Sequence, residues 1–369
     1  MVRQDSEIER LEREFVCVRV VQMKGVDLRT FQFDYDQTWA AFFLNADGSI
    51  YGRYGTRAGG KEHATTHISL ASLKKAMHTR AGGKEHATTH ISLASLKKAM
   101  QRALELHRGY PANKAQLAGK LGQQPEYQYA EQIPTAVAKA KQRHCIHCHN
   151  VTEDLRQTKY EQKRLAASDI WVYPLPENVG LKMDVDDGLR VEVVTPESPA
   201  AQAGILAGDE LVTMNGQRLI SQADIQWVLH HAPAKGQVTV TLNRGGQLLR
   251  ETIVPSGRWK ETDLSWRESS WALRPGLWTL PLSEAEKREK GIPGDALGLF
   301  VKWVPPRATL AKQAGLRDGD VIVAVDGQTA PMNESQFIAY VRLHHLLGDT
   351  VALTLLRGDR REDVKMQVE

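Results

Sequence analysis

The sequence has little cysteine, little net charge and no long apolar run. It holds 3 cysteines among 369 residues, and its formal net charge is +4. No run of 18 apolar residues occurs, so no membrane-spanning helix is predicted. The lysines and arginines form no stripe interleaved with aromatic residues, which argues against a nucleic-acid partner. The length predicts roughly two to four domains with ordinary globular cores.

Two of the three cysteines stand close together in the stretch HCIHCHN. The spacing Cys145-x-x-Cys148-His149 lets two thiols bond the vinyl groups of haem c while the next residue supplies an axial imidazole. We therefore predict covalent haem at Cys145 and Cys148, with His149 as the iron ligand. Alternatives stay open, because the same cysteines and the neighbouring histidines can also hold zinc, form a disulfide or have no function.

A stretch of the first half occurs twice, letter for letter, at 56–77 and at 79–100. Stable repeat architectures need at least three copies and usually drift at surface positions, so this tandem repeat over 56–101 indicates a recent duplication or a sequence-assembly error. The apolar spacing of the second copy continues into QRALELH, which predicts one helix over about 91–108.

The second half of the chain contains two similar segments. The first has a glycine loop, the motif SPAAQAGI followed by AGDEL and NG, a helix over 222–231 and two final strands. This order resembles a bacterial, circularly permuted PDZ domain. The resemblance implies that a peptide C-terminus binds as an added strand while backbone amides hold its carboxylate, so the expected partners are protein or peptide C-termini.

Matched positions in the PDZ pattern assign the peptide site to a carboxylate loop, a groove strand and the facing helix: Val179, Gly180, Leu181, Lys182, Met183, Ile225, Val228 and Leu229. The alternative is that some of these apolar side chains are ordinary core. The second PDZ-like segment is expected to have its carboxylate loop at Gly291 and Ile292. Pro293 would then begin its groove strand without an amide donor, so we expect only the first segment to bind peptides.

The N-terminal region shows a third pattern. Residues 14–23 are rich in β-formers, and 38–55 read as a strand, an Asp-Gly turn and a strand. This resembles the C-terminal half of a thioredoxin-like domain without its first strand and catalytic helix. Cys17 lies in the first apolar run and is expected to be a buried small hydrophobe.

Taken in order, these parts resemble a bacterial family of thioredoxin-like/PDZ (seleno)proteins. The expected fold is a multidomain α+β chain with these parts: a partial thioredoxin-like domain at 1–110, a linker with the Cys-x-x-Cys-His motif at 111–173, a first PDZ domain at 174–257, and a tryptophan-rich connector with a second PDZ domain at 258–369. The resemblance implies a redox-linked protein that binds haem c, docks partner C-termini and has a redox partner. The alternative function is a redox-inert PDZ scaffold whose cysteines are structural or bind zinc.

Two further expectations concern location and catalysis. The N-terminus lacks the apolar core of an export signal, so the chain is cytoplasmic if Met1 is its true start. The resemblance instead implies a truncated N-terminus and a periplasmic or otherwise extracytoplasmic protein. No Gly-x-Ser-x-Gly occurs, and no serine has evident His and Asp partners, so the sequence argues against a PDZ-carrying serine protease.

Overall fold

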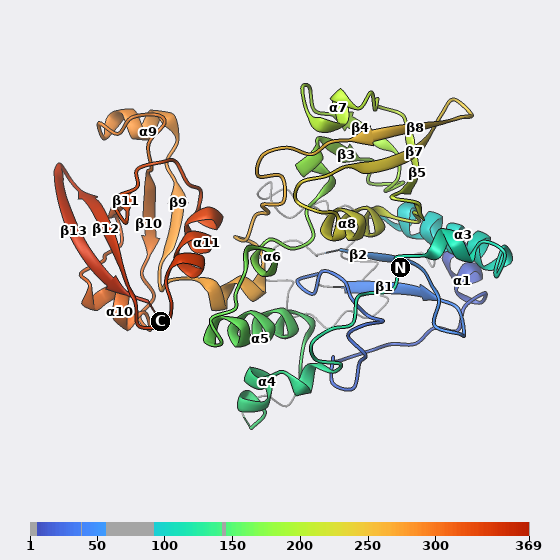
Figure 1. The fold of residues 1–369 in the computed structure, drawn as a ribbon, viewed down its shortest axis with the longest axis horizontal. Coiled ribbons are helices and arrows are strands. Elements are labelled where there is room, and N and C mark those ends of the chain that lie inside the picture. The colour runs from blue at the N-terminus through green and yellow to red at the C-terminus, as the bar shows by residue number, and fades with distance from the viewer. Residues whose placement is uncertain (1–5, 38, 57–91, 142–144, 369) are drawn as a thin grey trace. The chain divides into compact units, whose positions relative to one another are not determined.

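The computed structural model describes residues 6–37, 39–56, 92–141 and 145–368 (Figure 1). The chain divides into two compact units, Met1–Val151 with Trp171–Thr262, and Thr152–Ile170 with Asp263–Glu369. Each unit is described by itself. Among the described residues, no helix is both long enough and apolar enough to cross a membrane.

The N-terminal part of the first unit is a hairpin packed on helices. Its elements are α1 (Ser6–Glu12), β1 (Trp39–Leu44), β2 (Ile50–Thr56) and α3 (Leu93–Arg108). The turn between β1 and β2 uses Gly48 at a φ of 83°, and the two strands pair antiparallel. Ser92 caps α3 reciprocally with Ser95. The predicted hairpin and the predicted helix over 91–108 are confirmed.

The predicted strand over 14–23 is wrong. In the described part of the chain the sheet here contains β1 and β2 alone. Val16 and Val18 are 94% and 81% exposed. Cys17 is exposed as well, so its expected burial is wrong. A run of β-formers became no strand because no neighbouring strand pairs with it. A thioredoxin-like domain is therefore not supported, and the first copy of the duplication lies outside the described residues.

Short helices fill the segment between α3 and the first PDZ-like segment. They are η2 (Lys114–Leu117), η3 (Ala130–Gln132), α4 (Pro134–Lys139), α5 (Cys148–Glu161) and α6 (Ala167–Ile170).

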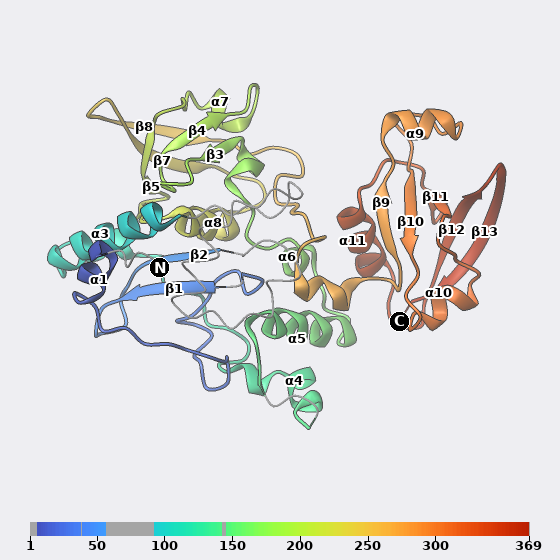
Figure 2. The ribbon, with the colours of Figure 1, turned by 180° about the vertical axis from the view of Figure 1, so that it is seen from behind.

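The first PDZ-like segment completes the first unit. Its elements are η4 (Pro176–Val179), β3 (Leu181–Met183), β4 (Val191–Val194), α7 (Pro199–Gln202), β5 (Glu210–Met214), β6 (Gln217–Arg218), α8 (Gln222–His231), β7 (Val238–Arg244) and β8 (Gln247–Ile253). β3 pairs with β4, and a second sheet has the order β6-β5-β7-β8. Figure 1 and Figure 2 both show α8 between these strands and β2. The predicted helix over 222–231 is confirmed.

The second unit contains the second PDZ-like segment. Its elements are η5 (Glu268–Leu273), β9 (Trp278–Pro281), α9 (Glu284–Glu289), β10 (Leu299–Trp303), α10 (Thr309–Gln313), β11 (Val321–Val325), α11 (Glu334–His344), β12 (Thr350–Arg357) and β13 (Arg360–Gln367). The strands form one antiparallel sheet in the order β13-β12-β11-β10-β9. In both views α11 lies alongside β9 (Figure 2).

The two PDZ-like segments share one ion pair at equivalent positions. Arg244 Nε lies 2.7 Å from Asp209 Oδ1 in the first segment. Arg357 Nε lies 2.8 Å from Asp320 Oδ1 in the second. Both carboxylates are buried, and each arginine comes from the strand that follows the long helix. The aspartates and arginines that match between the two sequences therefore form the same buried contact in both segments.

Candidate peptide-binding site

The first PDZ-like segment holds a free strand edge next to a helix. β3 pairs with β4 on one side, and no other strand of the described residues pairs with it. Side chains of β3 and α8 meet in one apolar cluster, to which Leu181, Met183, Ile225 and Leu229 belong. The second edge of β3 can therefore accept an added peptide strand, with α8 as the other wall.

Gly180 shapes the loop in front of β3. Its φ is 91°, and a Cβ built there would lie 2.0 Å from the Oγ of Ser198. Only glycine adopts this backbone while leaving room for the serine. The Gly180 N–H donates to the carbonyl of Glu177 at 3.0 Å, so this amide holds the turn itself. Gly180 thus positions the loop, and its own N–H is not available to a ligand in this conformation.

The apolar side chains predicted for the groove are brought together and are closely packed. Leu181, Ile225 and Leu229 are fully buried, and Val179, Met183 and Val228 are at most 2% exposed. Lys182 is the exception: its side chain is 53% exposed and its Nζ lies 3.0 Å from Glu192 Oε2. This burial agrees with the alternative that some of these side chains belong to the core. Their role in peptide binding stays a prediction.

The cysteine motif forms no compact ligand cluster in the described part of the chain. Cys145 is exposed, whereas Cys148 begins α5, and burial raises the pKa of its thiol to about 11. The rings of His147 and His149 stack with centroids 5.9 Å apart. Among the described residues, no three His, Cys, Asp or Glu side chains are placed to share a metal ion. Occupation of Cys145, Cys148 and His149 by haem c or zinc stays a prediction.

A buried ion pair joins α8 to the N-terminal part of the same unit. Lys120 Nζ lies 3.0 Å from Asp224 Oδ2, and the two side chains are 1% and 2% exposed. Lys120 also donates to the carbonyl of Tyr51 in β2, and Asp224 Oδ1 accepts the backbone N–H of Arg53 at 3.1 Å. Burial lowers the pKa of Lys120, and Asp224 opposes this shift. The helix wall of the groove is therefore held from its far side by β2 and its neighbours.

Close backbone approach reinforces this contact. A Cβ on Gly52 of β2 would lie 2.7 Å from Asp224 Oδ2. The guanidinium carbon of Arg53 lies 3.6 Å from the centroid of the Trp227 ring, and Trp227 Nε1 donates to the carbonyl of Gly119 at 2.9 Å. The sequence reasoning missed all of these residues. The one available signal was a glycine inside a predicted strand, which often marks close approach by another element.

The carboxylate loop assigned to Gly291–Ile292 in the second segment is wrong. Those residues follow α9, whereas the strand that corresponds to β3 is β9, which pairs with β10. β9 is preceded by Pro275-Gly276-Leu277, and Gly276 has a φ of 71°, in the same region as Gly180. The shared Gly-Leu pair was visible in the sequence, but α9 between β9 and β10 concealed the match.

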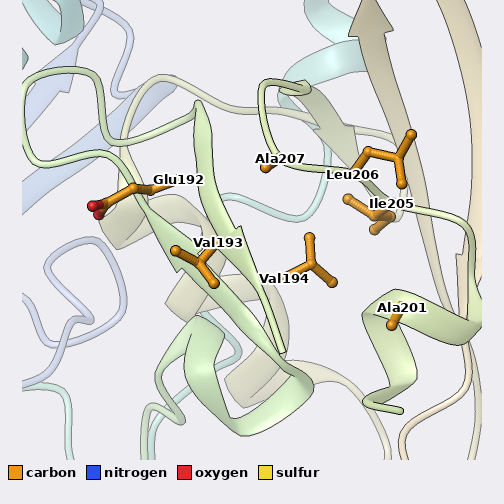
Figure 3. Close-up of a pocket in the computed structure, with 7 residues that line it drawn as sticks. All are labelled: Glu192, Val193, Val194, Ala201, Ile205, Leu206 and Ala207. Atoms are coloured by element: carbon orange, nitrogen blue, oxygen red, sulfur yellow. The ribbon is translucent and has the colours of Figure 1, made fainter. Parts of the chain in front are cut away.

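A separate hollow of about 400 Å³ lies on another face of the first segment (Figure 3). It is lined by Glu192, Val193, Val194, Ala201, Ile205, Leu206 and Ala207. Val193 and Leu206 are 46% and 53% exposed. Because its walls come from β4, α7 and the loop after α7, this hollow is not the groove between β3 and α8.

Both segments are small mixed α/β domains with a strand edge beside a helix, an arrangement suited to peptide recognition by strand addition. The protein-family model for the PDZ domain matches residues 178–253 and 298–368. The chain therefore carries two PDZ domains.

The known proteins whose sequences are similar to this chain are named as serine proteases. The chain is 29% identical over 181 residues to the probable periplasmic serine protease do/HhoA-like of Haemophilus influenzae, a match over 48% of this chain and 34% of the relative. It is 31% identical over 144 residues to the periplasmic pH-dependent serine endoprotease DegQ of Escherichia coli, over 39% of this chain and 29% of the relative. The chain thus spans about a third of the length of these relatives.

Among solved structures, the HtrA3 PDZ domain bound to a phage-derived ligand is similar. The sequence identity is 21%, the match covers 26% of this chain and 84% of that chain, and the TM-score is 0.22.

These comparisons correct the assignments made from the sequence. They support PDZ domains and a relationship to periplasmic serine proteases, and they give no support to a thioredoxin-like/PDZ (seleno)protein. The redox-linked haem c function is therefore wrong, and the comparisons give no support to a redox partner. The exclusion of a protease relationship is wrong as well. A motif of five residues carries far less information than two matched domains, and the sequence reasoning gave it too much weight.

Proposed function

We propose that the first PDZ domain binds free C-termini of other polypeptides by adding them as a strand to β3, in a periplasmic protein related to the HtrA-type serine proteases. The unpaired edge of β3 beside α8 is the observation that carries this proposal. The names of the curated relatives support the periplasmic location.

The packing of the groove supports a preference for small terminal side chains. Leu181, Met183, Ile225 and Leu229 are already buried against one another, so little space remains for the last side chain of a ligand. A peptide ending in Ala or Val needs less rearrangement than one ending in Phe, because a well-packed core resists added volume. Lys182 faces solvent and contributes through its backbone.

Titration of the full chain with hexapeptides ending in Ala, Val or Phe tests this function. Each peptide is made with a free and with an amidated C-terminus. We expect micromolar binding of the free acids, about 8 kcal/mol, and at least tenfold weaker binding of the amides. Equal binding of acid and amide would contradict carboxylate capture, and tighter binding of Phe would contradict the inferred preference for small residues.

Proteolysis is a second candidate function, favoured by the names of the curated relatives. Incubation of the protein with casein, with and without diisopropyl fluorophosphate, tests it. Cleavage that the inhibitor abolishes would support a serine-protease activity. Intact casein after long incubation would contradict it and leave the peptide-docking proposal unaffected.

A further inference from the structure

A partly buried lysine lies beside the last turn of α8 in the first PDZ domain. Lys260 Nζ donates to the carbonyl of His230, in the last turn of this helix, at 2.7 Å. The same Nζ lies 5.0 Å from the centroid of the Trp259 ring. Trp259 is buried in the apolar cluster that also contains Leu229 of α8. These contacts hold the ammonium group at the C-terminal end of the helix wall.

The backbone on both sides of Lys260 is tied to the start of the carboxylate loop. Asn178 of η4 donates through its side-chain amide to the carbonyls of Trp259 and Glu261, both at 2.7 Å. Asn178 stands two residues before Gly180 in the loop that leads into β3. Lys260 is the residue between the two bound carbonyls, so its backbone lies next to this loop while its side chain reaches the last turn of α8.

Lys260 has no carboxylate partner among the described residues. The acid that follows it in the chain, Glu261, pairs with Arg258 instead. Burial alone lowers the pKa of Lys260 to about 8, and no acidic group opposes this shift. The ammonium group carries three N–H donors and uses one of them on His230. A desolvated cation in this position is stabilised by an anion that a ligand brings.

The carboxylate loop by itself lacks one of its donors. The N–H of Gly180 donates to the carbonyl of Glu177 at 3.0 Å and is used within the turn. A carboxylate has two oxygens with about four lone-pair sites to satisfy. A cation beside the loop supplies a replacement donor, and charge-assisted hydrogen bonds are roughly twice as strong as neutral ones.

The second PDZ domain has a cation near the end of its long helix, but this cation comes from the helix itself. Arg342 of α11 donates to the carbonyls of Leu273 and Arg274 at 2.8 and 3.1 Å, and it is 5% exposed. Counted back from the paired histidines at the end of each helix, Arg342 corresponds to Val228 in the first domain. The first domain therefore has no cation at that helix position, and Lys260 comes from beyond the residues that the family model matches.

We propose that Lys260 binds the terminal carboxylate of a peptide added to β3, together with the backbone amides of the loop in front of that strand. The lysine lies in the segment after β8, so this segment is part of the binding site. The proposal rests on the strand-addition function proposed above, and it adds the side chain that recognises the charge of the ligand.

Titration of the full chain with a hexapeptide ending in Val, as free acid and as amide, tests this role. We expect Lys260→Met to bind the acid about tenfold more weakly than the wild type and the amide with unchanged affinity, because only the acid carries the charge. A purely structural role of Lys260 would weaken the binding of both peptides alike. Lys235→Met, at an exposed lysine of the same domain, is the matched control and should keep both wild-type affinities.

A second variant separates the charge of Lys260 from its hydrogen bond. Lys260→Gln keeps a donor for the carbonyl of His230 but has no charge, and it should lose affinity for the acid as Lys260→Met does. Equal weakening of acid and amide, or wild-type discrimination in either folded variant, would overturn the role of Lys260 and leave the proposed function standing. A wild type that does not distinguish acid from amide would count against the proposed function and against this role with it.

Discussion

Lys120 and Asp224 form an ion pair with a Nζ to Oδ2 distance of 3.0 Å, and neither side chain is more than 2% exposed. They are 104 residues apart in the sequence. Asp224 lies on α8, whose apolar side chains pack with those of β3, so this pair fixes one wall of the groove that we propose for peptides. Contacts with the N-terminal part of the unit thus stabilise the position of α8 in the first PDZ domain.

Removal of one partner of this pair should be strongly destabilising. Lys120→Met leaves the Asp224 carboxylate buried without its cation, and we expect a loss of about 3 to 5 kcal/mol in the free energy of unfolding, measured in urea. Lys120→Met with Asp224→Asn should recover part of the loss, because the amide oxygen still accepts from the Arg53 N–H, whereas the Ile220 N–H loses its acceptor at Oδ2. A double variant as unstable as the single one would show that the charge pair is not the cause.

The loop glycine of the first domain should be irreplaceable for steric reasons. Gly180→Ala places a Cβ 2.0 Å from Ser198 Oγ, and the expected result is displacement of the loop and loss of peptide binding. Gly208→Ala is the matched control, since Gly208 has a φ of 93° but no atom within 4 Å of its Cβ position. Both variants carry a backbone strain of about 1 to 2 kcal/mol. Equal peptide affinities for both variants in the titration would contradict the steric argument.

Asp209 should make the first domain sensitive to acid. Burial by itself raises the pKa of Asp209, but hydrogen bonds from Arg244 and from the Leu206 N–H outweigh it and lower that pKa. A lowered carboxyl pKa contributes stability above the usual range of aspartate, and this contribution is lost as the pH falls through the folded pKa. Asp209→Asn should therefore cost about 2 kcal/mol near neutral pH and less in acid. Urea unfolding at several pH values measures this, and a difference that does not vary with pH would refute it.

Lys260 should give a pH dependence of the same sign, but at alkaline pH. Its Nζ donates to the carbonyl of His230 at 2.7 Å, and burial lowers its pKa to about 8. An unfolded lysine titrates near 10.5. Between these two values the unfolded chain binds more protons, so the stability contribution rises with pH. Lys260→Met should remove this rise, whereas Lys235→Met, at an exposed lysine, should keep it. The measurement is the free energy of unfolding of both variants and the wild type from pH 7 to pH 10. An unchanged rise in Lys260→Met would contradict the prediction.

Local patterns in the sequence were enough to locate much of the first PDZ domain and part of the N-terminal unit. The helix over 222–231 and the hairpin around Gly48 follow from apolar spacing and turn residues, which act between near neighbours in the chain. The same local evidence failed over 14–23, because β-formers become a strand only when another strand pairs with them. It also misplaced the second groove, since a helix inserted between β9 and β10 separated the parts of the motif.

The sequence by itself determined that the chain carries two PDZ-like segments, because their patterns repeat over short spans. Only the tertiary structure decided which charges are buried and against what. The pairing of Lys120 with Asp224, and of Glu334 with Arg274, depends on the path of the chain in space. No local pattern encodes such pairs, since their stabilisation arises from desolvation and hydrogen bonding after the segments have met.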